Sequence, residues 1–238
     1  VMKKVGGILR FLKAVIFVLN YAIATYIVNI FGNGEKFLKQ RTGSGAKKLM
    51  NITGASITVL GTEYIDTNKH YIFVGNHRSY TDILVIFAAG GVAGCHFTFM
   101  AKKELFRIPF LGKAMTFLHV IGVERGSASK AMKSLLEAIE IVKTGINVVI
   151  FPEGTRSNDG YTLSPFKKGA FTIAKRAEVD VIPFVIDGTE KYMPKKGFGM
   201  YKADVSIKFY PPISTHDKTD TEIMNEAENV IKEALCQK

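Results

Sequence analysis

The hydrophobic and polar positions divide this chain into two parts with different patterns. From Val5 to Phe31 the sequence is almost wholly apolar, and the 18 residues of Ala14–Phe31 carry no charge. A bilayer-spanning helix needs roughly 20 apolar residues, so this stretch predicts a short spanning helix or a helix inserted into one leaflet. A secretory signal peptide is disfavoured because no small-residue cleavage signature follows the apolar run.

A basic segment follows the apolar run. Gly32-Asn33-Gly34 predicts a helix break, and residues 35–51 place a few apolar side chains among five Lys and Arg residues. We expect residues 1–52 to form a membrane-associated helical hairpin whose second arm lies at headgroup level, where each basic side chain contributes about 1 kcal/mol. The alternative is a core helix of a soluble domain followed by a solvated loop. The uncharged length beside a basic arm favours the membrane, and the break favours monotopic insertion over a full span.

From residue 53 onward, short apolar runs alternate with segments of helical periodicity. The runs predict strands over 57–60, 71–74, 96–101, 118–123, 147–151, 181–186 and 205–210. The periodic segments predict helices over 82–89, 109–116, 127–143, 167–177 and 220–235. This alternation predicts one α/β domain, residues 53–238, with a mostly parallel or mixed sheet flanked by helices. Pro183 argues against a central, fully paired position and for a strand end or a bulge.

Charge and cysteine content narrow the class of protein. The formal net charge is +11, and residues 1–60 hold nine Lys and Arg side chains against a single acid, Glu35. Because these charges flank an apolar segment, they indicate an anionic lipid surface and no nucleic acid. The two cysteines, Cys95 and Cys236, lie far apart without a C-x-x-C spacing, which is typical of a reducing compartment and predicts neither a disulfide framework nor a zinc site.

The candidate chemistry begins directly after the predicted strand 71–74. His77 and Asp82 stand five residues apart, between the carboxyl end of that strand and the start of the next helix, which Ser79, Thr81 or Asp82 is expected to cap. Open α/β sheets bind ligands at such turns. A carboxylate that accepts a hydrogen bond from one imidazole nitrogen fixes the tautomer that leaves the other nitrogen free as a base. The alternative is an ordinary turn residue beside a helix cap.

Two further polar clusters follow predicted strands, at Glu124-Arg125 and at Glu153–Arg156. Because parallel strands end at one edge of a sheet, we expect the three clusters to face a common cleft. Arg125 and Arg156 carry guanidinium groups suited to bidentate binding of phosphate, so a phosphorylated substrate is expected. No G-x-S-x-G motif is present and neither cysteine lies in a motif, so no acyl-enzyme is indicated. The scattered histidines predict no metal site.

Four sequence blocks, taken together, resemble those of the glycerolipid acyltransferase family. They are Asn76-His77-Arg78-Ser79-Tyr80-Thr81-Asp82, Gly122-Val123-Glu124-Arg125, Phe151-Pro152-Glu153-Gly154-Thr155-Arg156-Ser157 and Val181-Ile182-Pro183-Phe184. They occur in the family's order, and the resemblance covers roughly residues 53–212. The size and the apolar N-terminus are most similar to the bacterial 1-acylglycerol-3-phosphate acyltransferases. Glu124 departs from the residue that many relatives carry before the Arg, which leaves its role open.

The resemblance implies a role for each candidate residue. His77, oriented by Asp82, would deprotonate the sn-2 hydroxyl of lysophosphatidic acid as that oxygen attacks an acyl thioester of coenzyme A or acyl carrier protein, without a further cofactor. Arg125 and Arg156 would bind the substrate phosphate, and Glu153, Gly154 and Thr155 would shape the site. Arg125 as a surface cation, and Glu153 as a structural partner of Arg156, stay open alternatives.

The resemblance leaves other functions open. Lys102 and Lys103 are either phosphate or carrier contacts or a solvated pair. The acceptor could instead be glycerol-3-phosphate or another lipid, or the chain could be a non-catalytic lipid-binding protein. The expected location is the cytoplasmic face of the cell inner membrane, where the protein would produce phosphatidic acid for phospholipid biosynthesis.

Overall fold

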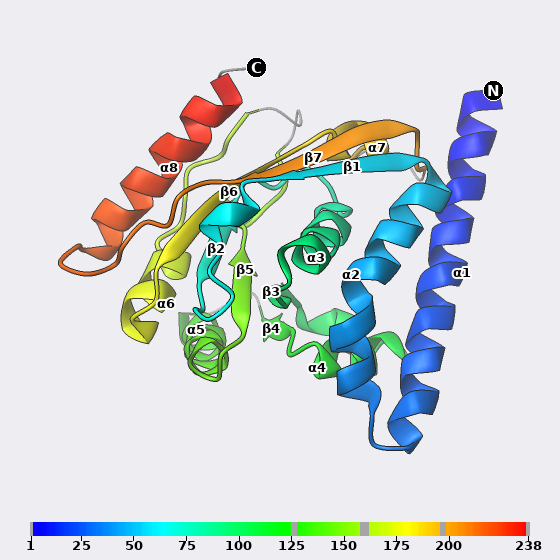
Figure 1. Ribbon diagram of the computed structural model, residues 1–238, viewed down its shortest axis with the longest axis horizontal. Helices are drawn as coiled ribbons and strands as arrows, with labels where there is room; N and C mark the ends of the chain where they lie inside the picture. Colours follow the sequence, from blue (N-terminus) through cyan, green and yellow to red (C-terminus); the bar gives the residue numbers. More distant parts are fainter. Residues whose placement is uncertain (1, 125–127, 158–161, 196–198, 237–238) are drawn as a thin grey trace.

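A computed structural model describes residues 2–124, 128–157, 162–195 and 199–236 of the chain. Its centre is a seven-stranded sheet in the order β1-β7-β6-β2-β5-β3-β4 (Figure 1). The strands are β1 (Ala55–Leu60), β2 (Ile72–Gly75), β3 (Phe97–Lys102), β4 (Ile121–Val123), β5 (Asn147–Ile150), β6 (Val181–Asp187) and β7 (Ala203–Phe209). All neighbouring pairs are parallel except β6 with β7, so the predicted mixed α/β sheet is confirmed.

Helices cover both faces of this sheet. They are α1 (Met2–Ile30), α2 (Gly34–Thr53), α3 (Asp82–Ala93), α4 (Leu111–Phe117), α5 (Ala128–Lys143), α6 (Gly169–Ala177), α7 (Thr189–Tyr192) and α8 (Asp220–Cys236), with 3-10 turns η1 (Thr62–Tyr64) and η2 (Lys103–Arg107). In Figure 1, α2 and α3 lie on one face, and α5, α6 and α8 lie on the other. Two buried hydrophobic clusters fill these two layers.

The central strands are buried on both faces, which explains their continuous apolar sequences. Every residue of β2 and β5 is buried, and so are the first six residues of β6. Parallel strands flanked by helices on both sides need apolar side chains at successive positions and not at alternate ones. The carboxyl ends of these strands therefore form one rigid edge, and the turns after β2 and β5 leave the sheet side by side.

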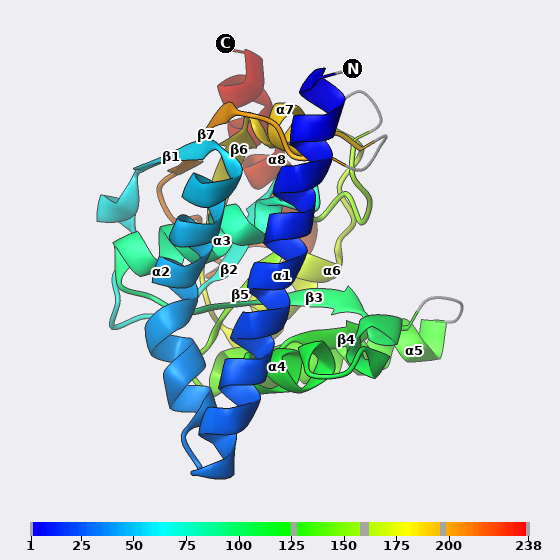
Figure 2. The same cartoon turned by 90° about the vertical axis from the view of Figure 1, so that its right-hand side faces the viewer.

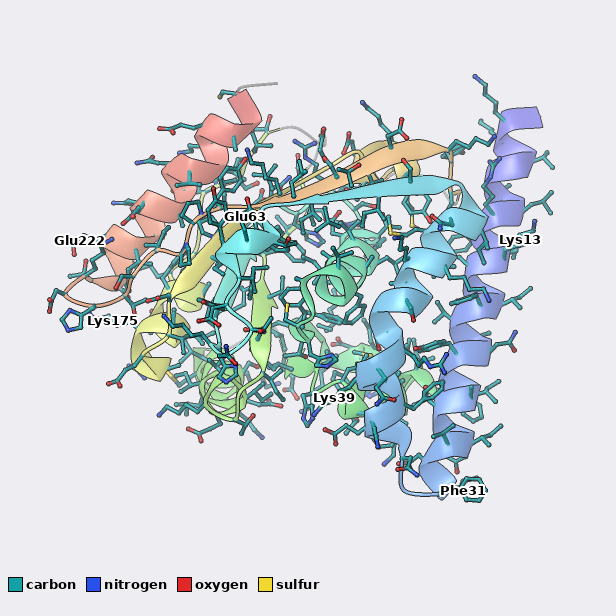
Figure 3. All side chains as sticks on the ribbon, viewed as in Figure 1. Lys13, Phe31, Lys39, Glu63, Lys175 and Glu222 are labelled. Carbon is teal, nitrogen blue, oxygen red and sulfur yellow. The ribbon has the colours of Figure 1, made fainter. Side chains whose placement is uncertain are left out.

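The N-terminal segment forms the expected pair of helices. Helix α1 runs alongside α2, and the turn between them carries Phe31 at its tip (Figures 1 and 3). Helix α2 packs on α3 through Gly43 and Gly91, whose backbones lie so close that a Cβ on Gly43 would stand 2.6 Å from the Gly91 Cα. Leu38, Leu49 and Met50 of α2 are buried. The second arm thus contributes to the core beneath the sheet.

The outer surface of α1 is largely apolar and exposed. Among the described residues, the segment Lys3–Ile30 is the one helix that is long and apolar enough to cross a membrane, and only 17% of its most apolar window is buried within the protein. Figure 2 shows α1 in front of the remaining elements. Its exposed side chains include Leu9, Ile16, Ile27 and Ile30, and Phe31 after it is 77% exposed. A core helix of a soluble domain would instead be mostly buried.

The local structure differs from the sequence-based expectations at three points. The predicted strand 118–123 is confined to Ile121–Val123, because Leu118 ends α4 and His119 takes a positive φ of 54°. Helix α7 was not predicted, since four residues are too short for a periodic pattern. Pro183 lies within the central strand β6: its carbonyl accepts from the Tyr210 N–H, and the antiparallel ladder with β7 starts only at Phe184.

A bulge nevertheless accompanies Pro183. The Val181–Ile213 bridge and the Phe184–Phe209 pair enclose two residues on β6 and three on the opposite segment. The extra residue interrupts the ladder where the proline nitrogen has no hydrogen to donate. The sheet thus accommodates a proline in a central strand by interrupting the pairing on one side only.

Candidate active site

The site is built around the turn between β2 and α3. The Nδ1 atom of His77 lies 2.7 Å from Oδ2 of Asp82, a carboxylate that is fully buried. Because a carboxylate accepts hydrogen bonds, this contact places a proton on Nδ1 and leaves Nε2 as the unprotonated nitrogen of a neutral ring. The His77 side chain is 20% exposed, so the ring is accessible to a substrate. The structure thus brings the two predicted residues together.

The start of α3 holds Asp82 in place. Asp82 is the first residue of the helix, and its Oδ2 also accepts from the backbone N–H groups of Arg78 at 2.8 Å and Ser79 at 2.9 Å. Thr81 occupies the N-cap position, but its side chain makes no capping hydrogen bond. The carboxylate therefore binds the turn that precedes the helix and does not cap the helix itself, and its charge interacts favourably with the helix dipole. The two backbone N–H groups fix the position of this oxygen and so the direction in which it faces the imidazole.

Glu153 connects the third sequence block to the first. Its Oε1 accepts from the His77 backbone N–H at 2.8 Å, and its Oε2 accepts from the Ser164 N–H at 2.8 Å. The side chain is buried, so both oxygens are used within the protein. The backbone of His77 is bound a second time, because its carbonyl accepts from Ser157 N–H at 2.9 Å. Glu153 is therefore structural, but its partners are backbone groups and not Arg156.

An aromatic side chain supports the face of the imidazole. The ring of Phe151 stacks on His77 with centroids 4.2 Å apart and an interplanar angle of 15°. Phe184 packs edge-on behind Phe151, and Gly75 makes room for it, since a Cβ there would lie 2.3 Å from the Phe184 ring. Phe151 was not among the predicted site residues. Its position follows from the strand register. Val74 pairs with Ile150, so the residue after β5 lies beside the turn that carries His77.

Asn76 anchors the turn to the neighbouring strand. Its Nδ2 donates to the Ile186 carbonyl at 2.8 Å and its Oδ1 accepts from the Ile186 N–H at 2.8 Å. The amide thus makes the two bonds that a further backbone pair between β2 and β6 would make. Arg78 adds an ion pair with Asp187 at 2.5 Å at the end of β6. Both residues are bonded to His77 in the chain, and their buried side chains hold its backbone against the end of β6.

Arg156 is placed close to the first block by a cation–π contact. Its guanidinium carbon lies 3.7 Å from the centroid of the Tyr80 ring, and Lys195 donates to its backbone carbonyl at 3.0 Å. No carboxylate among the described residues forms a salt bridge with this guanidinium, although the side chain is partly buried. A partly buried cation without a protein counter-ion is suited to an anionic ligand.

Gly154 and Thr155 complete the turn after β5. Gly154 has a φ of +68°, and a Cβ at this position would stand 2.8 Å from the Lys167 Nζ. Glycine is therefore favoured by the backbone conformation, whereas the flexible lysine side chain could move away from a Cβ. Thr155 is exposed. The turn thus brings the ammonium group of Lys167, which was not a predicted site residue, close to the backbone beside Glu153.

The second block follows β4 at the same edge. Glu124 pairs with Lys103 and with Lys130, the latter at 2.9 Å, and these two ammonium groups lower its pKa to about 2. A carboxylate with this pKa stays ionised at neutral pH, so Glu124 is not a proton donor there. Lys103 is thus an ion-pair partner, while Lys102 is exposed. Arg125 lies outside the described residues.

The chain's remaining reactive groups are far less suited to catalysis. Burial raises the pKa of the Cys95 thiol to about 12, which leaves the thiol protonated at neutral pH. Within the described ranges, no group of three or more His, Cys, Asp or Glu side chains is arranged to hold a metal ion. The expectation that the reaction needs neither a protein nucleophile nor a metal stays a prediction.

An apolar cavity adjoins this site. It has a volume of about 280 Å³, lies between α1, α2, α3 and α4, and extends to Ile83 and Leu84, the two residues that follow Asp82. Its lining is almost entirely hydrocarbon, with Phe17, Leu49, Phe99 and Met115 among the side chains. The geometry therefore combines a basic nitrogen, a guanidinium and an apolar cavity at one end of the sheet.

The fold and the site define an α/β protein with a partly buried histidine–aspartate pair at the carboxyl edge of its sheet and, before it, a helical hairpin whose first helix is apolar. The chain belongs to the Acyltransferase family, whose sequence model matches residues 56–187. The matched segment contains all four blocks described above. The family predicted from these blocks is thus confirmed.

Three known proteins show how far the similarity extends. A chloroplastic 1-acyl-sn-glycerol-3-phosphate acyltransferase of Brassica napus is 38% identical over 69% of this chain, but the alignment spans only 46% of that protein. A protein of the same name from Saccharomyces cerevisiae is 31% identical over 96% of this chain and 77% of its own length. The crystal structure of the 1-acyl-sn-glycerophosphate acyltransferase PlsC from Thermotoga maritima superposes with a TM-score of 0.83 at 27% identity, covering 99% of this chain and 97% of that one.

Proposed function

We propose that this protein transfers a fatty acyl group to the sn-2 hydroxyl of 1-acylglycerol-3-phosphate and so forms phosphatidic acid for phospholipid biosynthesis. The observation that carries the proposal is the His77–Asp82 pair, with Nε2 free, together with the Arg156 guanidinium, which contacts Tyr80 in the same turn and has no carboxylate partner among the described residues. The names of the relatives in Brassica napus, Saccharomyces cerevisiae and Thermotoga maritima support the same reaction.

In the proposed reaction His77 acts on the acceptor directly. Its Nε2 takes the proton of the sn-2 hydroxyl while that oxygen forms a bond to the thioester carbonyl carbon. The carbon–sulfur bond then breaks, and the thiolate leaves and is protonated by the imidazolium. Asp82 holds the ring in the required tautomer and stabilises its transient positive charge, and general base catalysis of this kind contributes about 10²–10⁴-fold. Atoms and charge balance without a covalent enzyme intermediate.

The acceptor phosphate is assigned to Arg156, with Arg125 as its proposed partner. Tyr80 supports the guanidinium of Arg156 from one face and leaves its donors directed elsewhere. A planar guanidinium binds a phosphate through two parallel hydrogen bonds, which orients the ligand as well as attracting it. A bound phosphate in this position would hold the glycerol hydroxyl near His77.

The lipid character of the substrate agrees with the N-terminal helical hairpin of the protein. We propose that the exposed apolar surface of α1 inserts into the cytoplasmic leaflet of the cell inner membrane, with α2 contributing basic side chains at headgroup level. We also propose that a substrate acyl chain occupies the apolar cavity beside α3. The donor is acyl-coenzyme A or acyl carrier protein.

An assay of phosphatidic acid formation by the purified full chain tests this proposal. Lysophosphatidic acid is supplied with acyl-coenzyme A or acyl carrier protein in parallel, and monoacylglycerol replaces it as an acceptor without phosphate. We expect transfer to lysophosphatidic acid, and we expect Arg156→Ala and Arg125→Ala to raise KM for that acceptor while changing transfer to monoacylglycerol little. An unchanged preference between the two acceptors in both variants would contradict the assignment of the phosphate site.

A further inference from the structure

A second apolar surface lies on the catalytic part of the chain, next to α1. The segment from η2 to the start of α4 exposes Leu105, Ile108 and Phe110, three large apolar side chains within six positions. Phe110 is 41% exposed. We name this segment, Leu105–Phe110, the apolar loop. Scattered single apolar residues are ordinary on protein surfaces, but a cluster in one loop needs a reason.

The apolar loop is continuous with the exposed side of α1. The ring of Phe110 meets that of Tyr26 edge to face, with centroids 5.6 Å apart and an interplanar angle of 81°. Tyr26 is itself exposed, and Ile23, Ile27 and Ile30 lie within a turn of it on the same helix. The apolar surface of α1 therefore does not end at the helix and continues onto the catalytic part of the chain.

The backbone of the loop holds Phe110 outward at a conformational cost. Phe110 has φ 62° and ψ −46°, and the Leu111 N–H bonds to the Pro109 carbonyl at 2.7 Å, which is the geometry of a strained γ-turn. A bulky residue rarely adopts a positive φ. Gly112 is equally constrained, because a Cβ there would lie 2.0 Å from the Phe106 carbonyl oxygen. Strain of this kind persists where a position has a function.

Part of the backbone around the loop is paired internally, which favours entry into a bilayer. The Ile108 N–H bonds to the Leu105 carbonyl, the Gly112 N–H to the Ile108 carbonyl, and the Ala114 N–H to the Phe110 carbonyl, all within 3.2 Å. Backbone groups paired inside a segment do not have to be desolvated alone in hydrocarbon. Arg107 and Lys113 are exposed on either side of Phe110, where anionic headgroups would attract them.

We propose that the apolar loop is a second membrane-inserting element, which enters the same leaflet as α1 and binds the hydrocarbon of an anionic bilayer. Leu105, and Leu111 directly after the loop, also line the apolar cavity next to the site. The loop thus lies between the bilayer and that cavity, so a lipid chain passes from one to the other without crossing water. This inference rests on the proposed membrane attachment through α1.

The absence of tryptophan from the sequence makes a direct test possible. A single Trp is introduced by Phe110→Trp, by Phe31→Trp at the hairpin tip, or by Tyr64→Trp on η1, and each protein is mixed with phosphatidylethanolamine–phosphatidylglycerol vesicles with or without brominated acyl chains. We expect the emission of the Phe110→Trp protein to shift to the blue and to be quenched by brominated chains to an extent similar to Phe31→Trp. Tyr64→Trp should change little.

Two outcomes distinguish this inference from the proposed attachment itself. If Phe31→Trp is quenched and Phe110→Trp is not, the loop stays outside the bilayer and the inference is wrong, while α1 still anchors the chain. If neither is quenched and the protein does not sediment with vesicles, the attachment fails as well. Phe110→Gly is a useful companion because glycine tolerates the positive φ, so a severalfold loss of vesicle binding in this variant would reflect the missing ring and not unfolding.

Discussion

The carboxylate of Glu153 accepts a hydrogen bond from the backbone N–H of His77, and the two residues lie 76 positions apart in the chain. The candidate base is therefore held at two levels: Asp82 orients its ring, and Glu153 fixes its backbone. The turn after β5 thus holds the backbone of His77 in place.

Replacement of Glu153 tests this structural role. In Glu153→Gln one amide oxygen can still accept from His77, but the amide NH₂ then faces the Ser164 N–H, and two donors oppose each other. We expect a loss of about 1–3 kcal/mol of stability and a fall in kcat of roughly 10-fold, with a smaller change in KM. Urea denaturation and steady-state kinetics measure both effects, and Glu137→Gln on the exposed surface of α5 is the matched control. A large rise in KM with kcat unchanged would instead make Glu153 a substrate contact.

Asn76 offers a test of the anchor between β2 and β6. Asn76→Ala removes both hydrogen bonds to Ile186, and each buried backbone group left unpaired costs about 1–3 kcal/mol. We expect a clear decrease in the free energy of unfolding, with Asn76→Asp intermediate because it keeps the acceptor for the Ile186 N–H. Asn225→Ala, on the exposed side of α8, should leave the denaturation midpoint almost unchanged. Equal stability of Asn76→Ala and Asn225→Ala would show that the hydrogen bonds between Asn76 and Ile186 do not stabilise the fold.

The contact between Arg156 and Tyr80 predicts how the phosphate site depends on an aromatic ring. A cation–π contact at an exposed position contributes about 0.5–1 kcal/mol, so Tyr80→Ala is expected to raise KM for lysophosphatidic acid by about 2–5-fold. Tyr80→Phe retains the ring and should leave KM near its original value. Initial rates over a range of acceptor concentrations distinguish the two variants. A similar effect of both substitutions would assign the role to the hydroxyl group.

The hydroxyl groups of Thr53 and Tyr192 link the end of α2 to α7, and they predict a pH dependence of stability. Burial raises the pKa of Tyr192 from 10.0 to about 12, so the folded state favours the neutral phenol. Its contribution to stability is therefore complete below pH 10 and declines as the pH rises toward about 12. We expect Tyr192→Phe to cost about 1 kcal/mol near neutral pH and to lose less stability than the original protein between pH 10 and 12. Denaturation series at both pH ranges measure this, and parallel pH curves would contradict it.

The sequence was informative where a physical pattern repeats over several residues. The continuous apolar runs predicted the buried parallel strands, and the polar clusters after them predicted the edge at which His77, Asp82 and Arg156 come together. The helical hairpin followed from an uncharged segment and a glycine-containing break. Each of these predictions came from a pattern among residues that are close in the chain.

The remaining features depend on contacts between distant residues. The partners of Glu153 and the position of Phe151 follow from the register of β2 on β5, which hydrophobic periodicity does not specify. Asn76 lies in the first sequence block, but its partner Ile186 is 110 positions away and follows only from the fold. The strained turn at Phe110 was not predicted either. Positive φ is normally predicted at glycine, and nothing in the sequence indicates it at this phenylalanine.

Acyl transfer by the His77→Ala protein tests the central claim most directly, because the account makes His77 the base that acts on the acceptor hydroxyl. The measurement is kcat for phosphatidic acid formation by purified full-length protein whose circular dichroism spectrum matches the original. We predict a decrease of about 10²–10⁴-fold with KM for lysophosphatidic acid little changed, since Arg156 and Tyr80 stay in place. A His77→Ala protein that retains full acyl transfer would contradict the account.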